Sequence, residues 1–329
     1  MAQQNMPLGL IGLDWGTSSL RAMLMSTTGE VLDVQSRPWG IMHLPPDPQG
    51  SADTRHSAAF ERALEDTCGH WLRHDPSLPV LACGMVGSAQ GWLEAAYLNS
   101  PASLDDLAKS LTRVTRTAGP ALHIVPGLIQ RSGLPNVMRG EETQVLGVLA
   151  GNLTQDHTPM LIGLPGTHSK WVTAQDRRIL SFDTFMTGEV FAALCGHTIL
   201  GKTMQAAMTP DDAAFVRGLV VAQSANAELG LLSNIFSTRS LGLTGDLSAG
   251  AQADYLSGVL MGHEVASLAR RQDSISTLRV MLCGEPDLCR RYAMALEVYG
   301  FKPPGISAQA TARGLWEIAV AAGLLVARH

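Results

Sequence analysis

The sequence predicts an α/β protein with two domains. Apolar segments with the length of buried strands alternate with helical segments along the 329 residues, and this alternation is typical of α/β folds. A strand–turn–strand unit opens the chain, and a second unit with the same kind of turn follows near the middle, so the two halves repeat one plan. A chain of this length also has room for two hydrophobic cores.

Composition limits the cellular compartments and the classes of partner that we expect for the protein. The formal net charge of −5 is spread without basic clusters, so we expect no nucleic-acid partner. Residues 1–7 lack the basic start of a signal peptide, and no apolar run is long enough to span a bilayer. The 5 cysteines show no Cys-x-x-Cys spacing and are typical of buried free thiols in a reducing compartment. We therefore expect a cytoplasmic protein without a membrane partner, and the sequence leaves open whether it forms a homo-oligomer.

The first strand–turn–strand unit is the most informative part of the chain. Residues 8–13 and 20–25 are apolar and predict two strands, with Arg21 inside the second. Between them, residues 14–19, here called the first turn, are rich in glycine and hydroxyl groups that can bind a phosphate. Asp14, at the end of the strand, can hold a hard divalent cation through its oxygens. The alternative is a plain β-hairpin with a surface aspartate.

Elements of both kinds follow in the first half. A strand at 31–35, a proline-rich loop at 44–53, a helix at 57–73 with one apolar side and a strand at 80–83 are expected in that order. The last strand runs into the flexible turn Gly84-Met85-Val86-Gly87-Ser88, and α/β folds place substrate loops after such strands. A strand at 123–125 then leads through a turn and a loop to Met138.

A helix is expected to begin at Glu141, directly after Arg139 and Gly140. Its apolar positions recur with helical spacing, and the acidic pair Glu141 and Glu142 suits the positive helix N-terminus. The polar stretch at 151–159 is expected to be the junction between the two domains.

The second half begins with a strand at 160–164, a turn at 165–170 and a strand at 171–173. This second turn, Pro165-Gly166-Thr167-His168-Ser169-Lys170, is again built from glycine and hydroxyl residues. The C-terminal third is expected to contain helices at 211–223 and 252–270, a strand at 277–283, a helix at 288–298 and an Ala-rich helix at 311–327.

These segments together resemble the sugar kinase/heat-shock-protein/actin superfamily and, within it, the 2-dehydro-3-deoxygalactonokinases. The resemblance spans most of the chain and is carried by residues 13–17, 84–88, 137–144, 165–171 and 186–189. It implies an α/β, two-domain actin-like ATPase (ribonuclease H-like) fold with the active site in a cleft between the domains. It also implies that domain 1, residues 1–155, holds the first turn and the sugar-acid site, with the helix at 311–329 packed on it. Domain 2, residues 156–310, then holds the second turn and the adenosine site.

The resemblance implies ATP and Mg²⁺ as cofactors, with Asp14 as the magnesium ligand. This chain has Leu164-Pro165 where the superfamily's second turn usually begins with an aspartate, so Asp14 would carry more of the metal binding. Lys170 either stabilises phosphate charge or is a strand lysine that faces solvent. The residues that the resemblance places at ATP are Gly16, Thr17, Ser18, Gly166, Thr167, His168, Lys170, Gly284 and Glu285.

The transfer of a phosphoryl group to a hydroxyl needs a carboxylate that can accept the hydroxyl proton. Glu141-Glu142-Thr143 stands where hexokinase-like enzymes, which this chain resembles, carry Asn-Asp-Thr at a helix start. This register assigns the base to Glu142 and a ligand role to Glu141, although the sequence leaves open which of the two accepts the proton. The alternative is that both acids only favour the helix dipole, each by about 0.3–1 kcal/mol.

A sugar acid needs a cation for its carboxylate, and Arg139 is the leading candidate because a guanidinium binds carboxylates well. The expected substrate-binding residues are Arg139, Glu141, Gly84, Met85, Gly87 and Ser88. From the resemblance we expect phosphorylation of 2-dehydro-3-deoxy-D-galactonate at its 6-hydroxyl, in galactonate catabolism. The alternatives are a kinase of another sugar or aldonic acid, such as 2-dehydro-3-deoxygluconate, and a non-catalytic nucleotide switch or sugar sensor.

Overall fold

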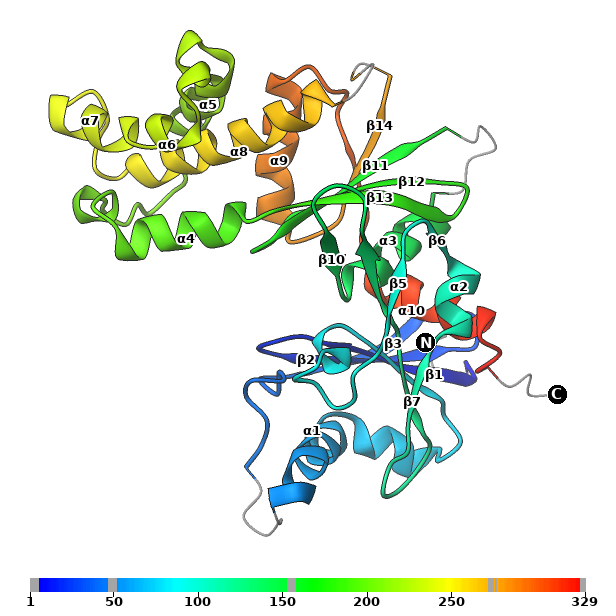
Figure 1. The fold of residues 1–329 in the computed structure, drawn as a ribbon. Helices are drawn as coiled ribbons and strands as arrows, with labels where there is room; N and C mark the ends of the chain where they lie inside the picture. Colours follow the sequence, from blue (N-terminus) through cyan, green and yellow to red (C-terminus); the bar gives the residue numbers. More distant parts are fainter. Residues whose placement is uncertain (1–5, 47–51, 153–157, 272–274, 276, 326–329) are drawn as a thin grey trace. The chain divides into compact units, whose positions relative to one another are not determined.

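The computed structural model describes residues 6–46, 52–152, 158–271, 275 and 277–325, and it divides into two compact units (Figure 1). Unit 1 takes the described residues of Met1–Thr158, Ala174–Phe182 and Gln309–His329. Unit 2 takes those of Pro159–Thr173 and Asp183–Ala308. Each unit combines a β-sheet with helices, so the chain is an α/β protein as predicted.

The main sheet of unit 1 has the strand order β3-β2-β1-β4-β8-β7. β1 lies antiparallel to β2 and parallel to β4, β4 lies parallel to β8, and the outer strands β3 and β7 are antiparallel to their neighbours. The strands are β1 (Leu8–Trp15), β2 (Leu20–Ser26), β3 (Val31–Arg37), β4 (Val80–Cys83), β7 (Thr112–Val114) and β8 (Leu122–Ile124).

Strand β1 is apolar from Leu8 to Leu13 because both of its faces are covered. Ile11 and Leu13 belong to one core with Phe60 of α1 (Ala52–His74). Gly12 points the other way, and a Cβ added to it would lie 3.1 Å from Leu315 of α10 (Ala310–Ala321). α10 in turn packs against α3 (Glu141–Ala150). The ends of β1 and β4 and the start of α3 are thereby held in one framework.

A second, small sheet in unit 1 has the order β10-β9-β5, and β9 and β10 lie where a turn and a loop were predicted. Its strands are β5 (Tyr97–Asn99), β9 (Gly127–Gln130) and β10 (Asn136–Met138). The loop prediction for residues up to Met138 was therefore wrong, because strands of three or four residues are too short to show an alternating pattern. Unit 1 also contains β6 (Ala102–Ser103) and α2 (Leu104–Lys109).

The sheet of unit 2 repeats the order of unit 1, as the second strand–turn–strand unit predicted. The six-stranded sheet runs β15-β14-β11-β12-β13-β6, with β11 parallel to β14 and β14 parallel to β15; its segment Ala174–Phe182 and the short β6 are counted with unit 1. The first strand of each unit thus lies between its second strand and its fourth, which is the ribonuclease H-like arrangement. The strands are β11 (Met160–Leu164), β12 (Ser169–Gln175), β13 (Arg178–Phe185), β14 (Arg279–Leu282) and β15 (Gly305–Ile306).

The helices of unit 2 include some that the sequence did not predict. α8 (Gln252–Arg270) has the predicted bounds, and the helix expected at 211–223 is α5 (Asp212–Leu219) continued by a 3-10 turn, Val220–Gln223. α9 (Pro286–Val298) begins two residues earlier than expected. α4 (Thr187–His197), α6 (Leu231–Asn234), α7 (Ser237–Thr244) and the 3-10 turns Gly201–Thr203 and Ala225–Leu229 were not predicted.

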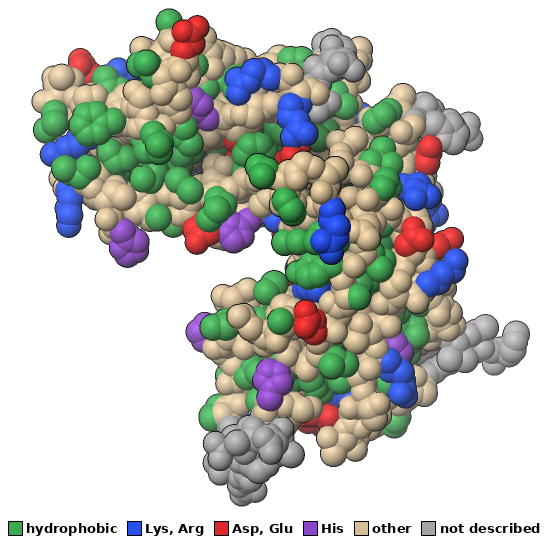
Figure 2. Space-filling view, viewed as in Figure 1, with side chains coloured by type: hydrophobic (Ala, Val, Ile, Leu, Met, Phe, Trp, Pro, Cys, Tyr) green, Lys and Arg blue, Asp and Glu red, His purple; other side chains and the backbone are tan. Residues whose placement is uncertain are grey.

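Hydrophobic side chains gather on the outer surface around α4, α6 and α7 in the view of Figure 2. No residue of α4 is fully buried, although most of its side chains are apolar. Among the exposed side chains are Ile199, Leu232, Phe236 and Leu243. This exposure weakens the helical periodicity from which a helix is predicted, because that pattern arises from one buried face.

None of the helices in the described part of the chain has both the length and the apolar character that crossing a membrane requires. The cysteines are free thiols, and all but Cys195 are buried.

Candidate active site

The first turn is a tight connection between β1 and β2. The backbone N–H of Gly16 donates to the carbonyl of Ser19 over 2.9 Å. Residues 41 and 42 anchor the turn from outside, because their N–H groups donate to the carbonyls of Gly16 and Thr17. The side chains of Thr17 and Ser18 are exposed. The turn therefore presents hydroxyl groups to solvent on a fixed backbone, as a phosphate-binding turn must.

Two glycines allow the end of β4 and the start of α3 to meet. Gly84 has φ of 94° and Gly140 has φ of 105°, values that other residues rarely adopt. A Cβ on Gly140 would lie 3.1 Å from the Cα of Gly84, and a Cβ on Gly84 would lie 2.8 Å from the carbonyl oxygen of Trp15. The close packing of these backbones brings Asp14, Gly84 and Glu142 into one region of unit 1.

The two glutamates at the start of α3 both hydrogen-bond to the preceding backbone. The Oε2 atom of Glu142 accepts from the Gly140 N–H over 2.7 Å, and its Oε1 accepts from the Thr143 hydroxyl over 3.0 Å. Glu141 accepts from the Arg139 N–H over 3.0 Å. Their environments differ, because Glu142 is fully buried and Glu141 is partly exposed. Burial, and then the neighbouring charge of Glu141, raise the pKa of Glu142 to about 8.

Asp14 lies at the end of β1, in register with Arg21 on one side and Cys83 on the other. Burial raises the pKa of its carboxyl group, the charge of Arg21 lowers it and the charge of Glu141 raises it again. Both Asp14 and Glu141 are partly exposed. Among the described residues there is no group of three or more His, Cys, Asp or Glu that could hold a metal ion. Asp14 fits a magnesium ion that takes its other ligands from phosphate and water.

Arg139 follows β10 directly, and the small sheet holds its side chain. The guanidinium lies over the Tyr97 ring of β5, with Cζ 4.3 Å from the ring centre, and its Nη2 donates to the Ala95 carbonyl over 2.7 Å. The residue is only 8% exposed. Its Nε and Nη1 atoms are buried without a hydrogen-bond partner among the described residues. A buried guanidinium with unused donors is expected to have an anionic partner.

The loop at residues 84–88 is a 3-10 turn, Met85–Gly87, and not the flexible turn that we expected. Its N–H groups are used internally, because Gly87 donates to the Gly84 carbonyl and Ser88 to the Met85 carbonyl. The hydroxyl oxygen of Ser88, however, is buried and has no partner among the described residues. A Cβ on Gly87 would lie 3.0 Å from Nη1 of Arg139, so this loop packs against the unused side of the guanidinium.

The second turn, in unit 2, is tied to the start of α4. The N–H of Glu189 donates to the Thr167 carbonyl over 3.0 Å, and the imidazole of His168 pairs with the Glu189 carboxylate. Thr167 and His168 are exposed. Lys170 is only 6% exposed and donates to the Thr184 hydroxyl, so it does not face solvent. The helix that holds this turn is one that the sequence did not predict.

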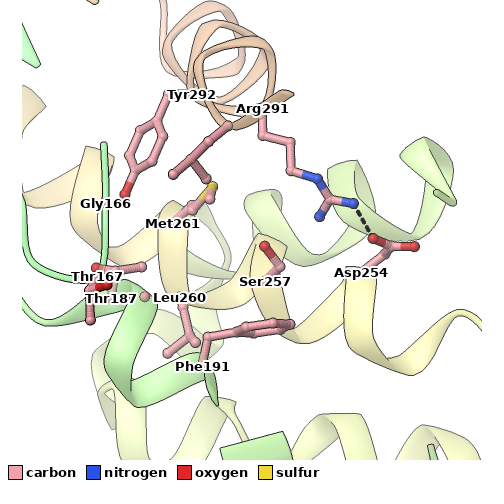
Figure 3. A pocket seen from close by; sticks show the side chains of 12 residues that line it. Gly166, Thr167, Thr187, Phe191, Asp254, Ser257, Leu260, Met261, Arg291 and Tyr292 are labelled. Carbon is pink, nitrogen blue, oxygen red and sulfur yellow. Dashed lines mark hydrogen bonds and ion pairs between the residues drawn. The ribbon is translucent and has the colours of Figure 1, made fainter. Parts of the chain in front are cut away.

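A cavity of about 440 Å³ opens beside the second turn (Figure 3). Its wall is partly apolar, from Phe191, Leu260, Met261 and Leu288. Figure 3 shows Arg291 of α9 reaching Asp254 of α8, with which it forms an ion pair. A cavity with apolar walls and a few polar groups at its edge suits a nucleoside. The lining residues are Gly166, Thr167, Thr187, Gly188, Phe191, Asp254, Ser257, Leu260, Met261, Leu288, Arg291 and Tyr292.

Of the residues predicted at ATP in unit 2, the cavity wall includes only Gly166 and Thr167. Gly284 and Glu285 lie at the start of α9, where the Glu285 carboxylate caps the helix by accepting from the Leu288 N–H over 3.0 Å. The cavity is instead lined by residues one and two turns further along this helix. The sequence pattern gave no signal for Asp254, Arg291 or Tyr97, because each becomes notable only through its contact with a distant residue.

The comparisons with known proteins agree with one another. A sequence model of the 2-keto-3-deoxy-galactonokinase family matches residues 14–318. The chain is 34% identical over 320 residues to the probable 2-dehydro-3-deoxygalactonokinase DgoK1 of Rhizobium meliloti (strain 1021). The aligned region covers 93% of this chain and 97% of that relative. It is 32% identical over 291 residues to the 2-dehydro-3-deoxygalactonokinase of Escherichia coli (strain K12). That alignment covers 88% of this chain and 90% of that relative.

A solved structure supports the same relationship. A crystal structure described as a 2-dehydro-3-deoxygalactonokinase protein from Sinorhizobium meliloti matches with a TM-score of 0.79 and 32% identity. The match covers 95% of this chain and 98% of that chain.

Proposed function

This chain belongs to the 2-keto-3-deoxy-galactonokinase family, and from that premise we propose that it transfers the γ-phosphoryl group of ATP to the 6-hydroxyl of 2-dehydro-3-deoxy-D-galactonate. The bond between the γ-phosphorus and the bridging oxygen breaks as the 6-oxygen bonds to phosphorus. The hydroxyl proton goes to a carboxylate, and the products are ADP and the 6-phospho acid. The reaction belongs to galactonate catabolism in the cytoplasm.

The observation that carries this proposal is the state of Arg139. Its guanidinium is buried, fixed by Tyr97 and the Ala95 carbonyl, and left with two nitrogen atoms that have no partner among the described residues. We assign it to the carboxylate of the sugar acid, because an ionic partner would satisfy these donors. The unpartnered hydroxyl of Ser88 is assigned to the same substrate.

The proton acceptor is one of the glutamates at the start of α3, and we propose Glu142. Its pKa of about 8 makes it a stronger base than an ordinary carboxylate once it is ionised. Glu141 is the second candidate, because it is partly exposed whereas Glu142 has no exposed surface in this structure. Substitution of each by glutamine decides between them.

The nucleotide is assigned to the cavity of unit 2. The apolar wall formed by Phe191, Leu260 and Met261 suits the base, and the second turn at Gly166 and Thr167 suits the phosphates. Asp14 and the first turn are assigned to the phosphates and to Mg²⁺ from unit 1. Bound with the nucleotide, Mg²⁺ would neutralise phosphate charge during transfer.

A panel of acceptors in an ADP-release assay tests this function. The panel contains 2-dehydro-3-deoxy-D-galactonate, 2-dehydro-3-deoxygluconate, D-galactonate and the neutral sugar D-galactose. We expect the highest kcat/KM with the first compound and none above background with galactose, which has no carboxylate for Arg139. Equal turnover of galactose would contradict the assignment of Arg139 to the substrate carboxylate. ADP release that no acceptor stimulates would contradict the proposal that the chain is a sugar-acid kinase.

A further inference from the structure

Glu264 of α8 is a buried carboxylate that the function proposed so far does not use. It is 2% exposed, and it is absent from the wall of the nucleotide cavity. It nevertheless sits among residues that form this wall, because Thr187 of α4 and Tyr292 of α9 both contact it and both line the cavity.

Three side chains from three different elements donate hydrogen bonds to Glu264. The indole Nε1 of Trp171, in β12, donates to Oε1 over 2.6 Å. The hydroxyl of Tyr292 donates to Oε2 over 2.8 Å, and the hydroxyl of Thr187 donates to the same oxygen. An ionised carboxylate can accept all three bonds, whereas a protonated carboxyl group would donate its own O–H to one of the two hydroxyls, which would then be the acceptor. Glu264 therefore joins β12, α4 and α9 at a single point.

The same network reaches the second turn by two routes. The Tyr292 hydroxyl donates its one hydrogen bond to Glu264. In the 2.8 Å contact between Tyr292 and Ser169 the serine hydroxyl is therefore the donor. Ser169 is the residue at which the second turn enters β12. On the other side, Thr187 holds the first turn of α4, whose Glu189 N–H binds the Thr167 carbonyl. Hydrogen bonds thus connect Glu264 to the second turn at Thr167 and at Ser169.

Fold stability alone gives little reason for a carboxylate at this place. Burial raises the pKa of Glu264, which shows that the surroundings disfavour its charged form. A well-packed apolar side chain often stabilises such a site as well as a buried charge does, so the network is better explained by the geometry that it sets.

We propose that Glu264 is a positioning residue that fixes the second turn and the start of α4 in the geometry that binds the nucleotide phosphates. This inference rests on the proposed use of ATP. It assigns no chemical step to Glu264, whose role is to hold Trp171, Thr187 and Tyr292 in place. It predicts that the residue controls nucleotide affinity without controlling sugar-acid affinity.

Two substitutions of Glu264 and one control test this role. Glu264→Met removes every acceptor while keeping much of the volume. In Glu264→Gln the amide oxygen must face Trp171, which can only donate, so the hydroxyls of Thr187 and Tyr292 must both reverse toward the amide nitrogen. Tyr299→Phe is the control, because the Tyr299 hydroxyl makes a buried bond of 2.8 Å to the Leu219 carbonyl in the same unit and lies outside the cavity wall.

ADP affinity is measured by titration calorimetry without sugar acid, and KM is measured for ATP and for the sugar acid. For Glu264→Met we expect the Kd of ADP and the KM of ATP to rise about tenfold, and for Glu264→Gln by a few-fold, with the KM of the sugar acid unchanged. Tyr299→Phe should lower Tm and leave the affinity for ADP unchanged. If Glu264→Met does not fold, the glutamine variant decides.

A folded Glu264→Gln protein with wild-type ADP affinity and ATP KM would overturn the proposal. So would a loss of ADP affinity in Tyr299→Phe as large as in the Glu264 variants, because general destabilisation would then explain both. Failure of the proposed function is seen separately, in wild-type protein that binds no ADP or transfers no phosphoryl group.

Discussion

At the scale of single residues, burial gives two adjacent glutamates different properties. Glu142 is enclosed by the Gly140 and Thr143 groups that it binds, and its pKa is raised to about 8, whereas Glu141 remains partly exposed. The sequence identifies the acidic pair as a candidate site, because two acids at a predicted helix start are visible as a pattern. It does not predict which member is buried, because that depends on how closely Gly140 approaches Gly84.

Glu142→Gln tests the proposed base. We expect kcat to fall by about 10²–10⁴-fold with little change in ADP binding, because glutamine cannot accept the hydroxyl proton. In wild-type protein, kcat should rise with pH through an apparent pKa of about 8, because only the ionised carboxylate accepts a proton. Glu94→Gln, at an exposed position, is the control. Full turnover in Glu142→Gln together with its loss in Glu141→Gln would assign the base to Glu141.

The raised pKa of Glu142 also predicts how stability depends on pH. Between its ordinary value of 4.5 and about 8, the folded state keeps the proton that the unfolded state releases, so rising pH destabilises the folded protein. Glutamine can accept from the Gly140 N–H through its amide oxygen and donate to the Thr143 hydroxyl through its amide nitrogen, and it has no proton to lose. Urea unfolding should therefore show Glu142→Gln gaining stability over wild type from pH 5 to pH 8, on the order of 1–3 kcal/mol. A difference that is the same at both pH values would show that the pKa of Glu142 is not raised.

Arg139→Lys tests the assignment of the substrate carboxylate. Lysine keeps the charge but loses the planar guanidinium that lies over Tyr97. We expect the KM of the sugar acid to rise about 10–100-fold, with the KM of ATP unchanged, as measured by initial rates. Arg131→Lys, at an exposed site, is the control and should match wild type. An equal rise in the KM of ATP would indicate a structural role for Arg139.

At the scale of elements, the small sheet shows what the sequence could not predict. β5, β9 and β10 are three or four residues long, so neither alternation nor length separates them from loop. They nevertheless set the position of Arg139, through Tyr97 in β5 and Met138 at the end of β10. The long elements were predictable because one or both of their faces are buried, as the apolar run of β1 shows.

The meeting of β4 and α3 makes a prediction at this scale. Gly140→Ala places a methyl group 3.1 Å from the Cα of Gly84 at a φ of 105°, whereas Gly133→Ala has φ of 68° and no neighbour within 4 Å. We expect Gly140→Ala to lower the free energy of unfolding by about 1–3 kcal/mol more than the control, and to reduce kcat as the glutamates shift. Urea midpoints and initial rates measure the two effects. Equal destabilisation by both substitutions would show that the close approach of Gly140 to Gly84 does not contribute to the free energy of unfolding.

At the scale of the whole molecule, the repeat of one strand order in two units is the part that the sequence predicts best. Each unit begins with a buried strand, a glycine- and hydroxyl-rich turn and a second strand, and each builds the same order around them. The residues that line the cavity of unit 2 were less predictable. α4 has no fully buried residue, and Arg291 and Asp254 become a pair only through the packing of α8 and α9.

The central claim is that this chain phosphorylates a sugar acid at its 6-hydroxyl with ATP. The most direct test is nuclear magnetic resonance of the products after incubation of the wild-type protein with ATP, Mg²⁺ and 2-dehydro-3-deoxy-D-galactonate. We predict ADP and the 6-phospho sugar acid in equal amounts, with the new phosphorus signal coupled to the protons on carbon 6. ADP formed together with free phosphate and an unchanged sugar acid would contradict the account.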